Sequence, residues 1–136
     1  MRLVVDTNVL VSALLNAGRT PDQALARVCE RRDSVLYDRR IADEYRAVLA
    51  RPKFQSIDPS RAEALVVALL ALGNDLGEVP AWTGTLIDPR DRCFVEVAIA
   101  GGADAIVTGN TRHYPTGLGF EVLPPAALLH RFVANP

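Results

Sequence analysis

The chain has little cysteine and no long apolar run, and these two absences exclude whole classes of protein. Its only cysteines, Cys29 and Cys93, lie far apart in helix-like segments, so free thiols in a reducing compartment are expected rather than a disulfide. No segment approaches the roughly 18 consecutive apolar residues that a membrane span requires. Asp6 and Asn8 interrupt the apolar N-terminal run, and no small-residue cleavage site follows, which argues against a signal peptide. The sequence therefore predicts a cytoplasmic protein with no membrane association.

Lysine is almost absent as well, since Lys53 is the only one and the other cationic side chains are arginines. The formal net charge of −1 excludes a protein that holds nucleic acid by bulk positive charge alone. It does not exclude a nuclease, because acidic metal ligands would offset basic residues elsewhere. With 136 residues, of which 49% are hydrophobic and 23% charged, the chain fits a single globular domain over residues 1–136.

Short apolar segments alternate with segments of helical periodicity along the chain. Strands are predicted at residues 3–5, 34–37, 105–107 and 121–123, and helices at about 7–15, 21–32, 39–50, 59–72, 89–100 and 125–132. Residues 75–85 are predicted to be loop, with a short strand at 78–79. The alternation with short connections indicates an α/β layer sandwich around a mostly parallel sheet. In that architecture ligands bind beyond the carboxyl ends of the strands.

Asp6 and Asp91 both stand where a carboxylate can serve either structure or chemistry. Asp6 directly follows a buried strand, at the sheet edge where sites form, but it would also cap the helix that follows. Asp91 begins a helix in line with apolar residues at i+3, i+4 and i+7, and the alternative is that it only complements the helix dipole. Asp88, just before Pro89, is the better N-cap, which leaves Asp91 free for another role.

Glu44 falls within the apolar stripe of its helix, which runs from Ile41 to Val48 and is expected to face the core. An ionised carboxylate there costs several kcal/mol unless it is paired or bound to metal. The structural alternative is that Glu44 lies at the edge of the stripe and pairs with Arg40 or Arg46.

Thr108 and Asn110 follow the strand at residues 105–107 and emerge at the same sheet edge as Asp6. The three carboxylates Asp6, Glu44 and Asp91 would repel one another there, and bound cations relieve such repulsion. Oxygen ligands without clustered His or Cys favour Mg²⁺ or Mn²⁺ over zinc. A site of this kind activates water and neutralises charge on a phosphodiester, and two metals about 3.5–4 Å apart would do both.

Four segments carry a resemblance to a known family when they are taken in order. They are Val4-Val5-Asp6-Thr7-Asn8-Val9-Leu10, then Glu44-Tyr45 with Arg51-Pro52-Lys53-Phe54, then Asp88-Pro89-Arg90-Asp91, and last Ile106-Val107-Thr108-Gly109-Asn110. Together they resemble the PIN-domain family, most closely the branch of VapC-like toxins from bacterial toxin–antitoxin pairs. The resemblance covers essentially the whole chain.

The resemblance implies a three-layer α/β/α fold and Mg²⁺- or Mn²⁺-dependent endonucleolytic cleavage of single-stranded or structured RNA. By motif position, Asp6, Glu44 and Asp91 match the metal-binding acids, and Asn8 and Thr108 match polar positions that line the site. Family members often have a fourth acid where this chain has Asn110, so a second metal would bind more weakly unless Asp88 compensates. A small antitoxin partner and a homodimer, with the apolar C-terminal helix contributing to the interface, are further implications.

Candidate RNA contacts lie close to these acids in the sequence. Arginines flank the beginnings of the helices that carry Glu44 and Asp91 and are candidates for binding RNA phosphates, or else are solvated surface residues: Arg39, Arg40, Arg90 and Arg92. His113 and Tyr114 either stack on a base or pack a loop.

Two other functions stay open from the sequence. Asn110 in place of an acid suits a catalytically weakened PIN-like module that binds RNA or protein. A phosphatase with Asp6 as nucleophile is the third alternative, although such enzymes usually have a second aspartate two residues later, where this chain has Asn8.

Overall fold

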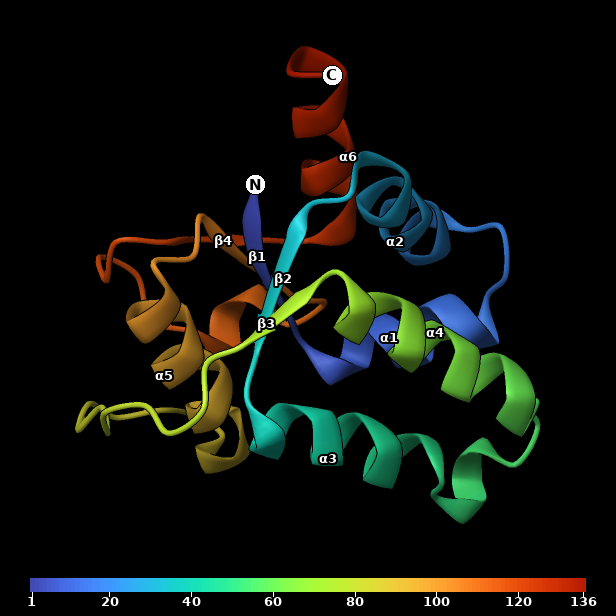
Figure 1. The fold of residues 1–136 in the computed structure, drawn as a ribbon, viewed down its shortest axis with the longest axis horizontal. Coiled ribbons are helices and arrows are strands. Elements are labelled where there is room, and N and C mark those ends of the chain that lie inside the picture. The colour runs from blue at the N-terminus through green and yellow to red at the C-terminus, as the bar shows by residue number, and fades with distance from the viewer.

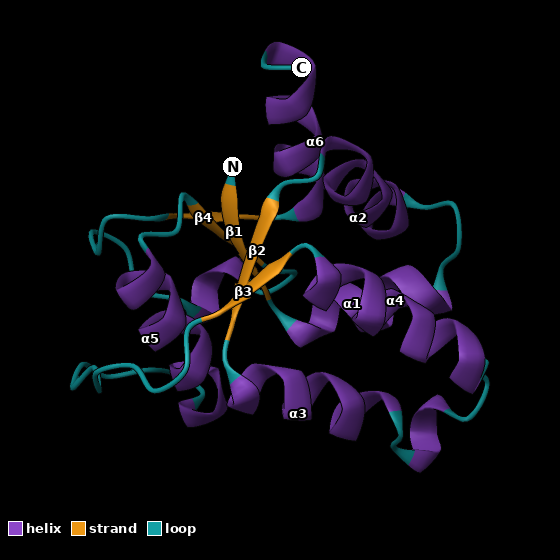
Figure 2. Ribbon diagram, viewed as in Figure 1, coloured by secondary structure: helices purple, strands orange, loops and turns teal.

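The computed structural model describes residues 1–136, and its helices and strands alternate along the chain (Figure 1, Figure 2). The elements in chain order are β1 (Arg2–Val5), α1 (Thr7–Leu15), α2 (Thr20–Arg31), β2 (Ser34–Tyr37), α3 (Arg39–Leu49), the 3₁₀ turn η1 (Pro52–Phe54), α4 (Pro59–Ala71), β3 (Gly73–Asp75), η2 (Pro89–Asp91), α5 (Arg92–Gly101), β4 (Ala105–Val107), η3 (Thr111–His113), β5 (Glu121–Leu123) and α6 (Pro125–Ala134). Helix and strand boundaries lie within a few residues of those predicted.

The five strands form one parallel sheet in the order β3-β2-β1-β4-β5. β1 lies at its centre, with Val5 opposite Val107 of β4 and Leu3 opposite Val35 of β2. Side chains in the middle of a parallel sheet are buried on both faces, and this explains the continuous apolar runs of β1 and β4. The parallel sheet expected from the sequence is confirmed.

Helices cover both faces of the sheet, which gives the three-layer α/β/α arrangement that the resemblance implied. α5 packs against β1, β2 and β4, and Figure 1 shows it on one side of the sheet with α1, α2 and α4 on the other. α3 follows β2 and lies along the lower edge in that view, where β1 also ends. The carboxyl edge of the sheet is therefore bordered by the beginnings of α1 and α3. None of the helices is long and apolar enough to cross a lipid bilayer.

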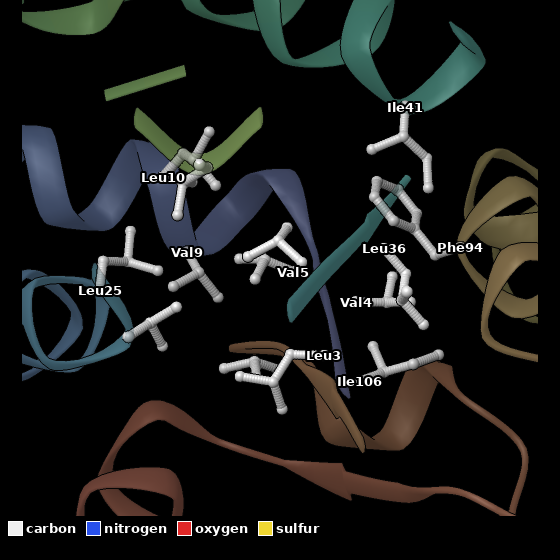
Figure 3. Close-up of a cluster of buried hydrophobic side chains, with 14 of the residues drawn as sticks. Leu3, Val4, Val5, Val9, Leu10, Leu25, Leu36, Ile41, Phe94 and Ile106 are labelled. Atoms are coloured by element: carbon white, nitrogen blue, oxygen red, sulfur yellow. The ribbon is translucent and has the colours of Figure 1, made fainter. Parts of the chain in front are cut away.

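The core is divided between the two faces by the alternation of side chains along each strand. Figure 3 shows Val4 and Ile106 on the side of Phe94, whereas Leu3 and Val5 lie on the side of α1. These residues are at most 1% exposed. Tyr45 of α3 is also fully buried, and its hydroxyl donates to the carbonyl oxygen of Val5 at 2.5 Å. That bond fixes α3 to the carboxyl end of the central strand.

One predicted strand is wrong in position. The structure has no strand at residues 78–79, and the edge strand β3 forms instead at Gly73–Asp75, parallel to β2. Glycine, asparagine and aspartate are depleted in strands, so the composition of Gly73–Asp75 predicted the end of the preceding helix rather than a strand. The strand forms because β2 offers its free edge to the chain directly after α4.

Candidate functional site

A pocket of about 350 Å³ lies at the carboxyl edge of the sheet and collects side chains from several elements. Seven of the predicted site residues line it: Asp6, Asn8, Glu44, Asp88, Arg90, Asp91 and Asn110. A larger hollow of about 610 Å³ lies at the amino ends of the strands. Its arginines are engaged by acids, Arg31 by Asp33 and Arg131 by Glu121. The pocket at the carboxyl edge is the one that gathers Asp6, Glu44 and Asp91.

Asp6 is both a helix cap and a member of this pocket, so the two readings of its position are compatible. Its Oδ1 accepts the amide N–H of Asn8 at 3.3 Å, which caps α1. Its Oδ2 accepts hydrogen bonds from Asn8 Nδ2 at 3.2 Å, Thr108 Oγ1 at 2.9 Å and the hydroxyl of Tyr114 at 2.9 Å. The carboxylate is 6% exposed and its orientation is set from three directions.

The ends of β1 and β4 are joined through side chains beneath the pocket. Thr108 is fully buried, and its hydroxyl donates to Asp6 while accepting the amide N–H of Asn110 at 3.0 Å. Asn8 Oδ1 accepts the amide N–H of Gly109 at 2.9 Å. Because each polar atom has a partner, this network holds Asp6 and the backbone of Asn110 in fixed relation.

Glu44 does not pair with either arginine that the sequence offered. Arg40 binds Asp38 and Glu96, and Arg46 binds Glu63. Glu44 Oε2 instead accepts the hydroxyl of Thr7 at 2.7 Å. Burial is the main cause that raises the pKa of Glu44, and the nearby charge of Asp6 adds to it against the lowering effect of the Thr7 hydroxyl.

Asp91 lies at the junction of η2 and α5 with its side chain 13% exposed. Burial, followed by the charges of Asp6 and Asp88, raises the pKa of Asp91 to about 6. His113 Nδ1 lies 3.7 Å from Asp91 Oδ2. Asp88 caps η2 as expected, by accepting the amide N–H of Arg90, and it also binds the Arg90 guanidinium.

Most of the arginines proposed to bind RNA lie outside the pocket. Arg39 is exposed beside Asp43, and Arg40 is held by two buried acids. Arg92 donates to the carbonyl oxygens of Trp82 and Gly84 and lies over the Trp82 ring. Of the four, only Arg90 lines the pocket, and Asp88 binds it.

Sequence reasoning did not assign Arg51 or Phe54 to the site, and it named Tyr114 only as a residue that stacks on a base or packs a loop. Arg51 and Phe54 line the pocket, and Tyr114 binds Asp6 from beneath. Arg51 and Phe54 belong to the segment that carried part of the family resemblance, which was the available signal. Nothing local relates Tyr114 to Asp6, since they are 108 residues apart.

The donor set of the pocket fits a hard divalent cation in kind. Carboxylates predominate and no Cys takes part, which is the ligand chemistry of Mg²⁺ and Mn²⁺. No group of three or more His, Cys, Asp and Glu side chains is close enough to hold a metal ion as the side chains stand. Burial and the charge of Asp6 raise the pKa of both Glu44 and Asp91, and a cation bound among these acids would favour their ionised forms.

Two comparisons with known proteins bear on the fold and on the family. The chain is similar in structure to a chain of the VapBC2 complex from Rickettsia felis bound to a DNA fragment from their promoter, at 13% identity and a TM-score of 0.58, covering 91% of this chain and 98% of that one. No curated protein sequence matches the chain. The family model for the PIN domain matches residues 2–112, a span that includes Asp6, Glu44 and Asp91. The chain therefore belongs to the PIN-domain family.

Proposed function

We propose that this protein is an endoribonuclease that hydrolyses RNA phosphodiester bonds with Mg²⁺ or Mn²⁺ bound by Asp6, Glu44 and Asp91. One observation carries the proposal. Buried acids elsewhere in the chain are paired with arginine, as Asp33 is with Arg31 and both Asp38 and Glu96 are with Arg40. In the pocket, Asp6, Glu44 and Asp91 have no such partner. PIN domains are generally nucleases, and three acids without an arginine partner in one pocket suit divalent metal.

The residues around the acids have distinct tasks in this proposal. Asp6, Glu44 and Asp91 would hold the divalent ion, which when bound would neutralise charge on the phosphodiester and lower the pKa of a bound water. Thr108 and Tyr114 orient the Asp6 carboxylate, and Thr7 orients Glu44. Asn110 adds a neutral carbonyl oxygen to the pocket in place of a fourth charge, so we propose that a single metal is held tightly.

We further propose a toxin role, opposed by a small antitoxin in the cytoplasm, with the protein as a homodimer. The structural similarity to a VapBC2 chain supports an antitoxin partner. If so, a short gene beside this one encodes a protein that binds this chain and suppresses its cleavage of RNA. A harmless effect of overexpression, or the lack of such a neighbour, would count against the toxin role and leave the nuclease proposal standing.

A circular single-stranded RNA tests the endonuclease proposal directly, because it offers no ends to an exonuclease. We expect the protein to linearise the circle with Mn²⁺ or Mg²⁺ and to leave it intact with chelator. Because Asn110 stands in place of a fourth acid, the alternative is a module that binds RNA without cutting it. The same assay tests that alternative. Chelator-independent binding of the circle with no cleavage under either metal would favour that alternative.

Tyr114→Phe is expected to weaken divalent-metal binding and cleavage by about 10- to 100-fold, because outer partners of metal ligands contribute to that extent. The substitution keeps the buried ring and removes only the hydroxyl that donates to Asp6. Mn²⁺ affinity can be measured by titration calorimetry alongside cleavage rates. Tyr37→Phe, which alters a half-buried tyrosine outside the pocket, is the matched control. Equal Mn²⁺ affinity in all three proteins would contradict the positioning role of Tyr114.

A further inference from the structure

The turn that follows α3 builds one wall of the acidic pocket. Glu44, Val48 and Arg51 recur at i, i+4 and i+7 and line the same pocket, so this wall extends directly from an acid of the cluster. Backbone hydrogen bonds hold the turn in place, from the amide of Arg51 to the oxygen of Val48 at 3.1 Å and from the amide of Phe54 to the oxygen of Arg51 at 2.9 Å. Buried Ile57 anchors the segment after it.

Arg51 is the one arginine of the pocket that is free to bind an anion. It is exposed, and it takes part in no ion pair of the structure. Arg90, the other arginine of the pocket, is bound by both carboxylate oxygens of Asp88 at 3.0–3.3 Å. A guanidinium without a carboxylate partner, beside a site for a phosphodiester, suits bidentate binding of phosphate.

Phe54 supplies an apolar surface next to this cation. The three hydrophobic residues that line the pocket are Val11, Val48 and Phe54. The Phe54 ring is half-buried, with the ammonium group of Lys53 at 5.0 Å from its centroid. Aromatic rings beside cationic groups are the usual platform for unpaired bases, because a base within a duplex has both its faces already stacked.

We propose that Arg51 and Phe54 form a nucleotide subsite beside the acid cluster. Arg51 binds a phosphate that flanks the cleaved bond, and Phe54, with Val48, receives the unpaired base of that nucleotide. This inference rests on the proposed ribonuclease function and makes it more specific, because it commits the pocket to RNA that is single-stranded next to the cut.

The subsite can be tested with variants of both residues on a short single-stranded RNA and on the same RNA annealed to its complement. Phe54→Leu and Arg51→Gln are each expected to raise KM for the single strand about tenfold with little change in kcat. Phe54→Tyr keeps an aromatic ring and is expected to have the same KM as the wild type. Arg39→Gln, an exposed arginine outside the pocket, is the charge-matched control. The duplex is expected to be a poor substrate for every protein.

Modified substrates show whether the two side chains act on one nucleotide. One nucleotide at a time is made abasic, and one phosphate at a time is replaced by the uncharged methylphosphonate. At a single position, the abasic substitution is expected to abolish the difference between wild type and Phe54→Leu. The methylphosphonate next to it is expected to abolish the difference between wild type and Arg51→Gln. Arg51 is solvent-exposed, so its variant gives a result even if Phe54→Leu does not fold.

The outcomes separate this inference from the proposed function. Two results would overturn the subsite and leave the nuclease intact, provided that the wild type cleaves RNA. One is a KM in Phe54→Leu and Arg51→Gln equal to that of the wild type. The other is that, at every modified position, the loss caused by the substrate modification simply adds to the loss caused by the side-chain substitution. Efficient cleavage of the duplex would also overturn it. A wild type that cleaves neither RNA with Mg²⁺ or Mn²⁺ would overturn the nuclease itself.

Discussion

Asp91→Asn is expected to reduce RNA cleavage by about 10²–10³-fold and, at the same time, to stabilise the metal-free protein at neutral pH. Burial and the charges of Asp6 and Asp88 raise the pKa of Asp91 to about 6 in the folded protein, against about 3.9 in an unfolded chain. The folded state therefore binds the proton more tightly, and the free energy of unfolding falls as pH rises from about 4 to 6. Asparagine does not ionise, so Asp91→Asn removes this loss of stability, and it also removes the carboxylate proposed to bind metal.

The measurement is urea unfolding of wild type and Asp91→Asn in chelator over a range of pH. The variant is expected to be more stable than the wild type by only about 1–2 kcal/mol at pH 7, because solvent in the open pocket screens part of the repulsion. Near pH 4 the two proteins are expected to be equally stable. Added Mn²⁺ should stabilise the wild type and have less effect on the variant. Asp43→Asn, at an exposed acid with a weak partner, serves as control. A wild type more stable than Asp91→Asn at pH 7 would show that Asp91 supports the fold.

Arg40→Ala is expected to lower the free energy of unfolding by about 3 kcal/mol. Arg40 donates two hydrogen bonds to Asp38 and one to Glu96 at 2.6–2.9 Å, and both acids have side chains only 5% exposed. Burial alone would raise the pKa of Glu96, but hydrogen bonds from Arg40 and from the Trp82 amide outweigh it and hold that pKa below its usual value. Without Arg40, the two buried carboxylates would keep only backbone N–H partners, from Ile41 and Trp82, and α3 would lose its ion pair with α5.

Urea unfolding at pH 7 measures this effect, with Arg46→Ala as the matched control. Arg46 pairs with Glu63 on the surface, both about half exposed, so its loss is expected to change the stability by less than about 1 kcal/mol. The difference between wild type and Arg40→Ala should narrow as pH falls through the folded pKa of Glu96, because a protonated acid needs no cation. Equal effects of the two substitutions would refute the role of Arg40.

Much of the fold could be predicted because its signals are local. The apolar runs at residues 3–5 and 105–107 and the helical stripe of α3 each reflect burial within one element, and the structure places them as expected. β3 could not be predicted in this way. Its residues are polar and lie at the edge of the sheet, so pairing with β2, rather than any property of Gly73–Asp75, makes the strand.

The same distinction applies to the site. Asp6, Glu44 and Asp91 could be selected because a carboxylate at a strand end or within an apolar stripe violates a local pattern. Arg40 and Arg92 could not be assigned, because their partners, Glu96 and the Trp82 carbonyl, are brought to them by tertiary structure. Arg51 follows Glu44 and Val48 at i+7 but lies beyond the end of α3, so its place in the pocket depends on the turn that forms there.

The most direct test of the account is to incubate the wild type and Asp6→Ala with a pool of single-stranded and structured RNA in Mg²⁺, in Mn²⁺ and in chelator. Both proteins should first be shown to be folded, since Asp6 also caps α1. Cleavage by the wild type alone, abolished by chelator, is the predicted result and would assign the metal chemistry to Asp6. Equal cleavage by both proteins, or cleavage that persists in chelator, would contradict it.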